Sequence, residues 1–225
     1  MLKALIFDFD GLILDTETPL LQSWREVFDR HQFPIDAGAL ARIIEVSREP
    51  PEAYILLEAM PGTPIDRESL RAARLAREAQ LISEQRPLPG VESILAKARA
   101  VGLKTAIASN SPLSWIDPHL VRLNLASSFQ CIRSKDDVRR VKPDPELYLT
   151  VLADLSIGAS EAVAFEDSPI GAEAARRAGV VCVAVPNSAT AGLTWGHVDL
   201  MVPSLDSVTL DQLAALGSRH RDGGR

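Results

Sequence analysis

Short apolar runs alternate with amphipathic helical stretches along most of this sequence, and no other feature constrains the fold as strongly. A short apolar run that ends at glycine or a polar turn is typical of a buried strand, whereas apolar residues spaced three and four apart indicate a helix. Strands that alternate with helices form a parallel sheet with helices on both faces. We therefore expect a three-layer α/β core. Its strands are expected from Ala4 to an acidic turn at Asp8, and at 104–108, 129–133, 162–165, 180–185 and 200–202.

The segment at residues 16–87 interrupts this alternation with helical patterns alone. We expect helices at 18–32, 37–46, 51–59 and 67–83, followed by a stiff proline-rich connector at Arg86–Gly90. This pattern predicts an all-helical cap domain at 16–87, inserted into a discontinuous core of residues 1–15 and 88–225. The polar, glycine-rich tail at 217–225 is expected to be disordered.

Composition excludes several classes of protein. The net charge is −6, and no dense block of lysine and arginine indicates a nucleic-acid surface. Cys131 and Cys182 are too few and too isolated for a disulfide framework. The N-terminus lacks the pattern of a signal peptide, and no apolar stretch approaches the length of a membrane span. We expect a cytoplasmic monomer that binds neither nucleic acid nor membrane.

Residues with catalytic or metal-binding chemistry follow several of the expected strands. In parallel α/β sheets the ligand site lies outside the carboxyl ends of the strands. Two carboxylates close together repel each other unless a cation compensates, and Mg²⁺ prefers such oxygen ligands. Carboxylates, a hydroxyl group and a fixed cation suit phosphoryl transfer, in which an aspartate can act as nucleophile. The residues concerned are Asp8 with Asp10, Ser109, Lys142, and Glu166 with Asp167.

Each of these residues also has a purely structural explanation. Ser109 could cap the helix that starts near Pro112, and Lys142 could be a solvated loop lysine. Glu166 and Asp167 could be acids at a helix N-terminus, where the helix dipole favours them. Their coincidence at successive strand ends favours the functional interpretation. Trp115, in contrast, is expected to be a packing or rim residue.

Four short motifs occur along the chain, namely Phe7–Gly11, Ala108–Asn110, Lys142–Pro143 and Phe165–Ser168. In order and spacing they resemble those of the haloacid dehalogenase-like (HAD) hydrolases. The pattern most resembles the β-phosphoglucomutase-like subfamily, in which a helical cap follows the first motif, and Asp15–Glu17 resembles the entry to that cap. The resemblance implies a Rossmann-like core, Mg²⁺ as cofactor and a small phosphorylated metabolite as substrate.

The resemblance also implies a role for each catalytic residue. Asp8 would be the nucleophile that attacks phosphorus and a metal ligand. Asp10 would be the general acid and base, with its backbone carbonyl bound to Mg²⁺. Lys142 would neutralise charge on Asp8 and the phosphoryl group, and the Lys142–Pro143 bond is expected to be cis. Dehalogenases of this fold lack an acid at the position of Asp10, so the resemblance to them stops at the fold.

The remaining motif residues would bind metal or substrate. Asp167 would complete the metal ligands, with Glu166 beside it as a ligand or as a holder of bound water. Ser109 would donate a hydrogen bond to the phosphoryl oxygens, together with the Asn110 amide. These assignments are also carried by the resemblance.

The cap sequence bears on whether the chain is a phosphatase or a mutase. Val46–Glu49 resembles a stretch through which related sugar-phosphate mutases hold a distal phosphate by an arginine, here Arg48, although Arg48 could also be a surface residue at a helix end. Glu45 and Leu20 stand where those mutases have glycine and histidine. We therefore expect a Mg²⁺-dependent phosphatase of sugar phosphates or nucleoside-type monophosphates. A β-phosphoglucomutase-type mutase and a catalytically silent binding scaffold are the alternatives.

Overall fold

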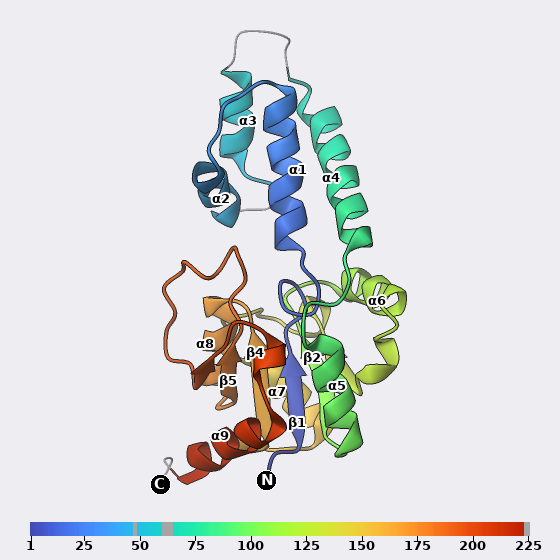
Figure 1. The fold of residues 1–225 in the computed structure, drawn as a ribbon, viewed down its shortest axis with the longest axis vertical. Coiled ribbons are helices and arrows are strands. Elements are labelled where there is room, and N and C mark those ends of the chain that lie inside the picture. The colour runs from blue at the N-terminus through green and yellow to red at the C-terminus, as the bar shows by residue number, and fades with distance from the viewer. Residues whose placement is uncertain (47–48, 60–64, 223–225) are drawn as a thin grey trace. The chain divides into compact units, whose positions relative to one another are not determined.

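The computed structural model describes residues 1–46, 49–59 and 65–222, and it divides the chain into two compact units. The core unit comprises Met1–Leu14 and Arg86–Arg225, and the helical unit comprises Asp15–Gln85. From the sequence, the helical insertion is expected at 16–87. Both units can be followed by colour in Figure 1.

In the described part of the core unit, six strands form one parallel sheet in the order β3-β2-β1-β4-β5-β6. The expected fold class is therefore confirmed. The central strands are buried on both faces, which explains why they consist of nearly continuous apolar residues. The strands are β1 (Ala4–Phe7), β2 (Lys104–Ala108), β3 (Cys131–Arg133), β4 (Ala162–Glu166), β5 (Val181–Ala184) and β6 (Leu200–Met201).

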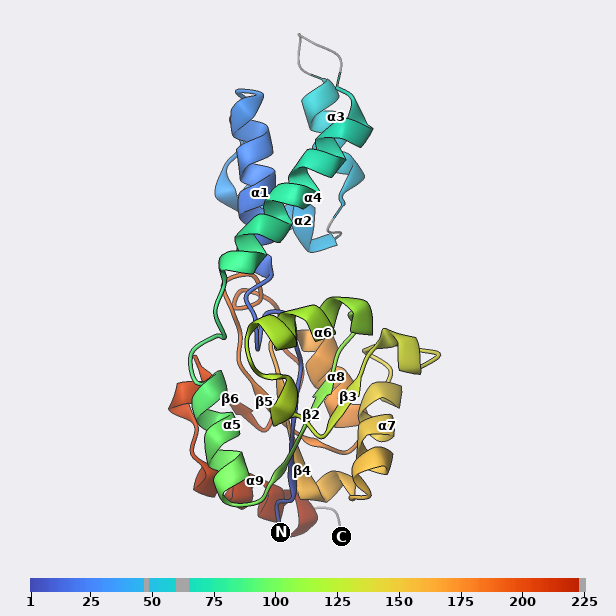
Figure 2. The same ribbon diagram turned by 90° about the vertical axis from the view of Figure 1, so that its right-hand side faces the viewer.

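Helices cover both faces of this sheet. Figure 2 shows the sheet between α5 and α9 on one side and α7 and α8 on the other. Alternate side chains of β1 point to opposite faces, so Ala4 and Ile6 join the cluster packed under α7 and α8. The helices of this unit are α5 (Val91–Ala100), α6 (Leu113–Arg122), α7 (Glu146–Leu155), α8 (Pro169–Arg177) and α9 (Leu210–Asp222).

The register of the strands brings the polar motifs together at the carboxyl edge of the sheet. Phe7 of β1 lies opposite Ile107 of β2 and Phe165 of β4, and its ring stacks on that of Phe165 at 5.1 Å between centroids. The next residue of each strand therefore reaches the same carboxyl edge. Asp8 and Glu166 stand side by side there because β1 and β4 are adjacent and in register.

The helical unit is a bundle with its own apolar core. Asp15 caps the first helix, since its Oδ1 accepts the backbone N–H groups of Glu17 and Thr18 at 3.1 and 2.9 Å. Trp24 is completely buried and packs edge-on against Tyr54. The helices are α1 (Glu17–Arg30), α2 (Ala37–Val46), α3 (Pro51–Glu58) and α4 (Arg67–Glu84).

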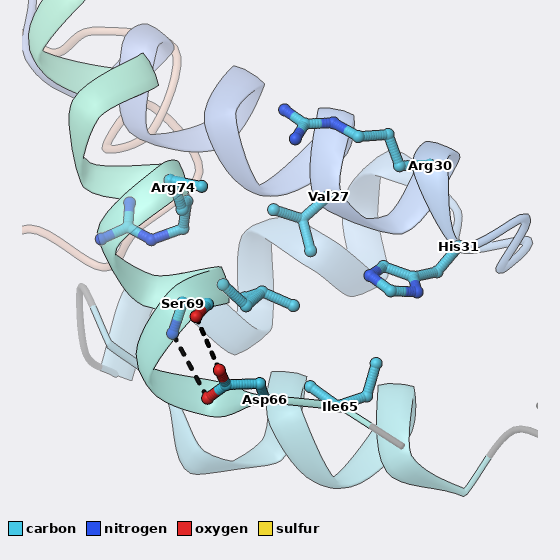
Figure 3. Close-up of a pocket in the computed structure, with 9 residues that line it drawn as sticks. Val27, Arg30, His31, Ile65, Asp66, Ser69 and Arg74 are labelled. Carbon is cyan, nitrogen blue, oxygen red and sulfur yellow. Dashed lines mark hydrogen bonds between the residues drawn. The ribbon is translucent and has the colours of Figure 1, made fainter. Parts of the chain in front are cut away.

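A buried cation ties α4 to α1 within this bundle. The guanidinium of Arg74 pairs with Glu78, donates to the Ser23 hydroxyl at 3.1 Å, and lies 4.9 Å from the centre of the Trp24 ring. A pocket of about 300 Å³ opens beside it, lined by residues of the helical unit that include Val27, Ser69 and Arg74 (Figure 3). No described helix is long and apolar enough to cross a bilayer.

The C-terminus differs from the expectation. Helix α9 continues to Asp222, where the sequence analysis places a disordered tail from Gly217 onward; residues 223–225 lie outside the described part of the chain. Leu213 and Leu216 are buried and fix the helix against the core unit. A single glycine costs a helix about 1 kcal/mol, which does not end a helix that is anchored in this way.

Candidate active site

The ammonium group of Lys142 is the centre of the site. Its Nζ lies 2.6 Å from Asp8 Oδ1 and 2.6 Å from Glu166 Oε1, and both the lysine and Glu166 are buried. Tyr148 of α7 also donates its hydroxyl to Glu166 Oε1. The Lys142–Pro143 bond is cis, as expected. Residues from three motifs therefore form one ion cluster, although Asp8 and Glu166 are more than a hundred positions apart in the sequence.

Burial and charge shift the pKa values of this cluster. Desolvation raises the pKa of Asp8, partly opposed by Lys142, and it raises the pKa of Glu166 to about 7. Burial alone would lower the pKa of Lys142, but the carboxylates of Asp8 and Glu166 outweigh it and raise that pKa. The lysine therefore stays charged, and the excess negative charge falls on the carboxylates.

Three carboxylates are placed to hold a metal ion. One oxygen each from Asp8, Glu166 and Asp167 lie within 4.8 Å of one another. Among the described residues, the single positive charge of Lys142 faces these three carboxylates. One ammonium group cannot balance three negative charges. Glu166 Oε2 is buried and accepts no hydrogen bond from any described residue. Hard oxygen donors with excess negative charge fit a cation such as Mg²⁺.

Asp167 is held from a loop that follows β5. Asn187 Nδ2 donates to Asp167 Oδ2 at 2.8 Å and to the carbonyl of Gly11 at 3.2 Å. Asn187 Oδ1 in turn accepts the N–H of Ala189 at 2.9 Å, which fixes the amide. Gly11 has a φ of +74°, and a Cβ there would overlap the Asp167 carboxylate. The turn after β1 thus needs glycine for both its conformation and its close approach to Asp167.

Gly171 of α8 provides the space for Glu166. A Cβ at position 171 would overlap the Glu166 carboxylate, which cannot swing aside because Lys142 and Tyr148 hold it. We expect Gly171→Ala to destabilise the protein by about 1–3 kcal/mol through overpacking, although alanine favours a helix. The measurement is the free energy of unfolding in urea.

The matched control is Gly217→Ala in α9, where the nearest atom to the new Cβ is 3.8 Å away. That variant should be neutral or stabilised by up to about 1 kcal/mol. Equal effects of the two substitutions would contradict the role given to Gly171.

The side chain of Asn110 is bonded to the backbone of Lys142. Its Oδ1 accepts the N–H of Lys142 at 2.9 Å and its Nδ2 donates to the carbonyl of Lys142 at 3.3 Å. Asn110 therefore positions the lysine backbone, and its expected contact with substrate stays a prediction. Ser109 is buried at the end of β2, and its Oγ accepts the N–H of Ser111 at 3.1 Å.

Two side chains donate hydrogen bonds to the Asp10 carboxylate, one from just before α6 and one from its first turns. Ser111 Oγ donates to Asp10 Oδ2 at 2.5 Å, and Trp115 Nε1 donates to Asp10 Oδ1 at 2.9 Å. Trp115 packs against His119, as expected of a packing or rim residue, and its indole N–H also donates to the expected acid, a contact that the sequence did not predict. Arg48, the cap residue expected to bind substrate, lies outside the described residues.

The comparison with known proteins agrees with this geometry. The family model described as "Haloacid dehalogenase-like hydrolase" matches residues 5–185, which include all four motifs. The chain belongs to the haloacid dehalogenase-like hydrolases.

Relatives of this HAD-like hydrolase include phosphatases. YhcW of Bacillus subtilis is 39% identical over 93% of this chain and 95% of its own length, and it is named as a phosphatase by inference. The phosphorylated carbohydrates phosphatase of Thermotoga maritima is 33% identical over 80% of this chain and 82% of its own length. The crystal structure of a provisional beta-phosphoglucomutase from Thermotoga maritima superposes with a TM-score of 0.78 at 28% identity, covering 95% of this chain and 99% of that one. The β-phosphoglucomutase-like resemblance is thus confirmed.

Four residues of this HAD-like site were not predicted from the sequence. Asn187 follows the carboxyl end of β5, so the rule that points to the other strand ends could have found it. Ser111 lies between the Ala108–Asn110 motif and the expected helix start near Pro112, and neither pattern gives it a role. Tyr148 and Trp115 sit at helical positions that look like core, and no local pattern distinguishes a tyrosine or tryptophan whose polar atom meets a carboxylate.

Proposed function

We propose that this protein is a Mg²⁺-dependent phosphatase that hydrolyses small phosphorylated metabolites, sugar phosphates first, through an aspartyl-phosphate on Asp8. The observation that carries the proposal is the contact of Lys142 Nζ with Asp8 Oδ1 at 2.6 Å inside a cluster of three carboxylates. It combines a buried carboxylate able to act as nucleophile with a fixed cation that can neutralise a phosphoryl group. The phosphatase relatives support the same reaction class.

The first half-reaction transfers the phosphoryl group to the protein. An oxygen of Asp8 forms a bond to phosphorus while the bond between phosphorus and the leaving oxygen breaks. Asp10 gives its proton to that oxygen, so the product leaves as a neutral alcohol. Ser109 donates a hydrogen bond to a phosphoryl oxygen, and Lys142 balances the negative charge near Asp8.

The second half-reaction restores the enzyme. Asp10, now a carboxylate, takes a proton from a water molecule while the oxygen of that water forms a bond to phosphorus. The bond between phosphorus and the Asp8 oxygen breaks, which releases inorganic phosphate and leaves Asp8 ionised. The proton lost by Asp10 in the first step is thus regained in the second.

The metal would be held by residues on the same edge of the sheet. Asp8 and Asp167 would bind Mg²⁺ with their carboxylates, the backbone carbonyl of Asp10 would add a ligand, and Glu166 would be a ligand or hold bound water. When bound, Mg²⁺ supplies positive charge that stabilises the transferring phosphoryl group. Asn187 keeps the Asp167 carboxylate oriented for this role.

We assign the helical unit, Asp15–Gln85, the role of a cap that selects the substrate, by analogy with the subfamily that the motifs resemble. Leu20 supports a phosphatase over a mutase. It is buried in the apolar core of the helical unit and carries no group that could assist Asp10 as the mutase histidine does. The likeness to the Thermotoga maritima structure favours the mutase as the second candidate.

The proposal predicts phosphate release that depends on a divalent cation. Purified protein is incubated with β-glucose 1-phosphate, glucose 6-phosphate and nucleoside monophosphates, with and without Mg²⁺. We expect sugar phosphates to be hydrolysed fastest, and we expect chelation to lower the rate by at least about 10³-fold because charge neutralisation is lost.

The same panel separates the alternatives. β-Glucose 1-phosphate is also supplied with glucose 1,6-bisphosphate. Appearance of glucose 6-phosphate without free phosphate would identify a mutase instead. Absence of turnover in every mixture would favour the silent scaffold, and full activity in the presence of a chelator would contradict the metal assignment alone.

A further inference from the structure

Both carboxylate oxygens of Asp10 are bonded by side chains from one short segment of the core unit. Trp115 Nε1 lies 2.9 Å from Oδ1, and Ser111 Oγ lies 2.5 Å from Oδ2. A side chain with a two-fold terminal torsion is thereby fixed in both position and plane.

The two donors are themselves held. The backbone N–H of Ser111 donates to Ser109 Oγ at 3.1 Å, which links the support of Asp10 to the residue proposed to bind the phosphoryl group. The indole of Trp115 packs edge-on against His119, with 4.6 Å between ring centroids. Asp136 accepts the N–H of Leu113 at 2.9 Å and fixes the first turn of α6. Trp115 therefore lies in the first turns of α6, which Asp136 fixes, and Ser111 lies just before that helix with its backbone bonded to Ser109.

The donors differ in what they can do. An indole N–H can only donate, so the oxygen that faces Trp115 must act as an acceptor in both protonation states of Asp10. A serine hydroxyl can donate or accept, so Ser111 can bond the other oxygen whether or not that oxygen carries a proton. The arrangement distinguishes two oxygens that are equivalent in a free carboxylate.

We propose that Trp115 and Ser111 are positioning residues that place the transferable proton of Asp10 on Oδ2 and aim it at the leaving oxygen of the substrate. This inference rests on the proposed function. As the bond between phosphorus and the leaving oxygen breaks and the Asp8–phosphorus bond forms, the proton moves from Asp10 Oδ2 to the leaving oxygen. Attacking water later returns a proton to the same Oδ2.

Such a device matters for some leaving groups and not for others. The oxygen of a sugar is a strongly basic leaving group and needs a proton as its bond to phosphorus breaks. The p-nitrophenolate ion is weakly basic and leaves without one. Positioning of Asp10 should therefore affect the two substrate classes unequally, whereas loss of folding or of phosphate binding should affect them alike.

The test compares kcat/KM for p-nitrophenyl phosphate with kcat/KM for the sugar phosphate that the wild type hydrolyses fastest. This constant covers the steps up to departure of the leaving group and omits the hydrolysis of the aspartyl-phosphate. We expect Ser111→Ala and Trp115→Phe each to lower kcat/KM for the sugar phosphate by roughly 10- to 100-fold and to change kcat/KM for p-nitrophenyl phosphate by less than about 3-fold. Ser111→Thr, which keeps the hydroxyl, should recover most of the loss.

Ser114→Ala is the matched control, because Ser114 is an exposed neighbour of Trp115 on the same helix; it should leave both constants unchanged. Thermal unfolding is recorded for every variant, and Ser111→Ala decides the test if Trp115→Phe does not fold. Equal losses for both substrates, or no loss for either, would overturn the inference and leave the phosphatase proposal intact. A wild type that hydrolyses neither substrate would overturn both.

Discussion

Asp8→Asn is expected to lower phosphate release by at least about 10⁴-fold while leaving the fold intact. The amide has almost the same shape as the carboxylate, and its oxygen can still accept the hydrogen bond that Lys142 Nζ now donates to Asp8 Oδ1. An amide is not a nucleophile toward phosphorus, so the aspartyl-phosphate cannot form. The measurement is phosphate release in Mg²⁺ from the best substrate of the panel, with the circular dichroism spectrum recorded in parallel.

The control for this substitution is Asp117→Asn, on the exposed side of α6, which makes the same chemical change away from the ion cluster. It should retain wild-type activity. If Asp8→Asn releases phosphate at the wild-type rate, Asp8 is not the nucleophile. Loss of the native spectrum together with activity would require repeating the test with Asp8→Ser.

Lys142→Met is expected to affect stability as well as catalysis. The ammonium group of Lys142 contacts both Asp8 and Glu166. The substitution removes that group and leaves two buried carboxylates without their cation. Breaking a buried pair in this way costs about 3–5 kcal/mol. Activity should fall by at least about 10³-fold, because the charge of the phosphoryl group is no longer balanced.

The stability loss should depend on pH with a defined sign. Burial already raises the pKa of Glu166 to about 7 from its ordinary value of 4.5, and Lys142 opposes that rise. A carboxyl group whose pKa is higher in the folded chain favours folding while it is protonated, and this contribution is lost as pH rises through the folded pKa. The deficit of Lys142→Met relative to wild type should therefore be larger at about pH 8 than at about pH 6.

Urea unfolding at the two pH values, in a metal chelator, measures this difference. Lys142→Met combined with Glu166→Gln should regain part of the stability and none of the activity. Lys135→Met removes an exposed lysine and should change neither quantity. A deficit that shrinks as pH rises would show that Lys142 does not act by compensating these carboxylates.

Much of the core was predictable because its determinants are local. Buried apolar runs define β1, β2 and β4, and a parallel sheet brings their carboxyl ends together whatever the intervening sequence is. That rule alone places Asp8, Ser109 and Glu166 at the same edge of the sheet. The helix at 217–222 was not predictable, because burial of Leu213 and Leu216 outweighs the local effect of Gly217.

The fold class, the order of the motifs and the residue types available for phosphoryl transfer could all be predicted from local patterns in the chain. The packing of the folded chain sets which atoms meet. It joined Lys142 to Asp8 and Glu166, turned Asn110 toward the Lys142 backbone, and brought Trp115 to Asp10. The reason is physical: periodicity and turn chemistry act over a few residues, whereas a hydrogen bond between residues a hundred positions apart depends on how the elements pack and on the register of their strands.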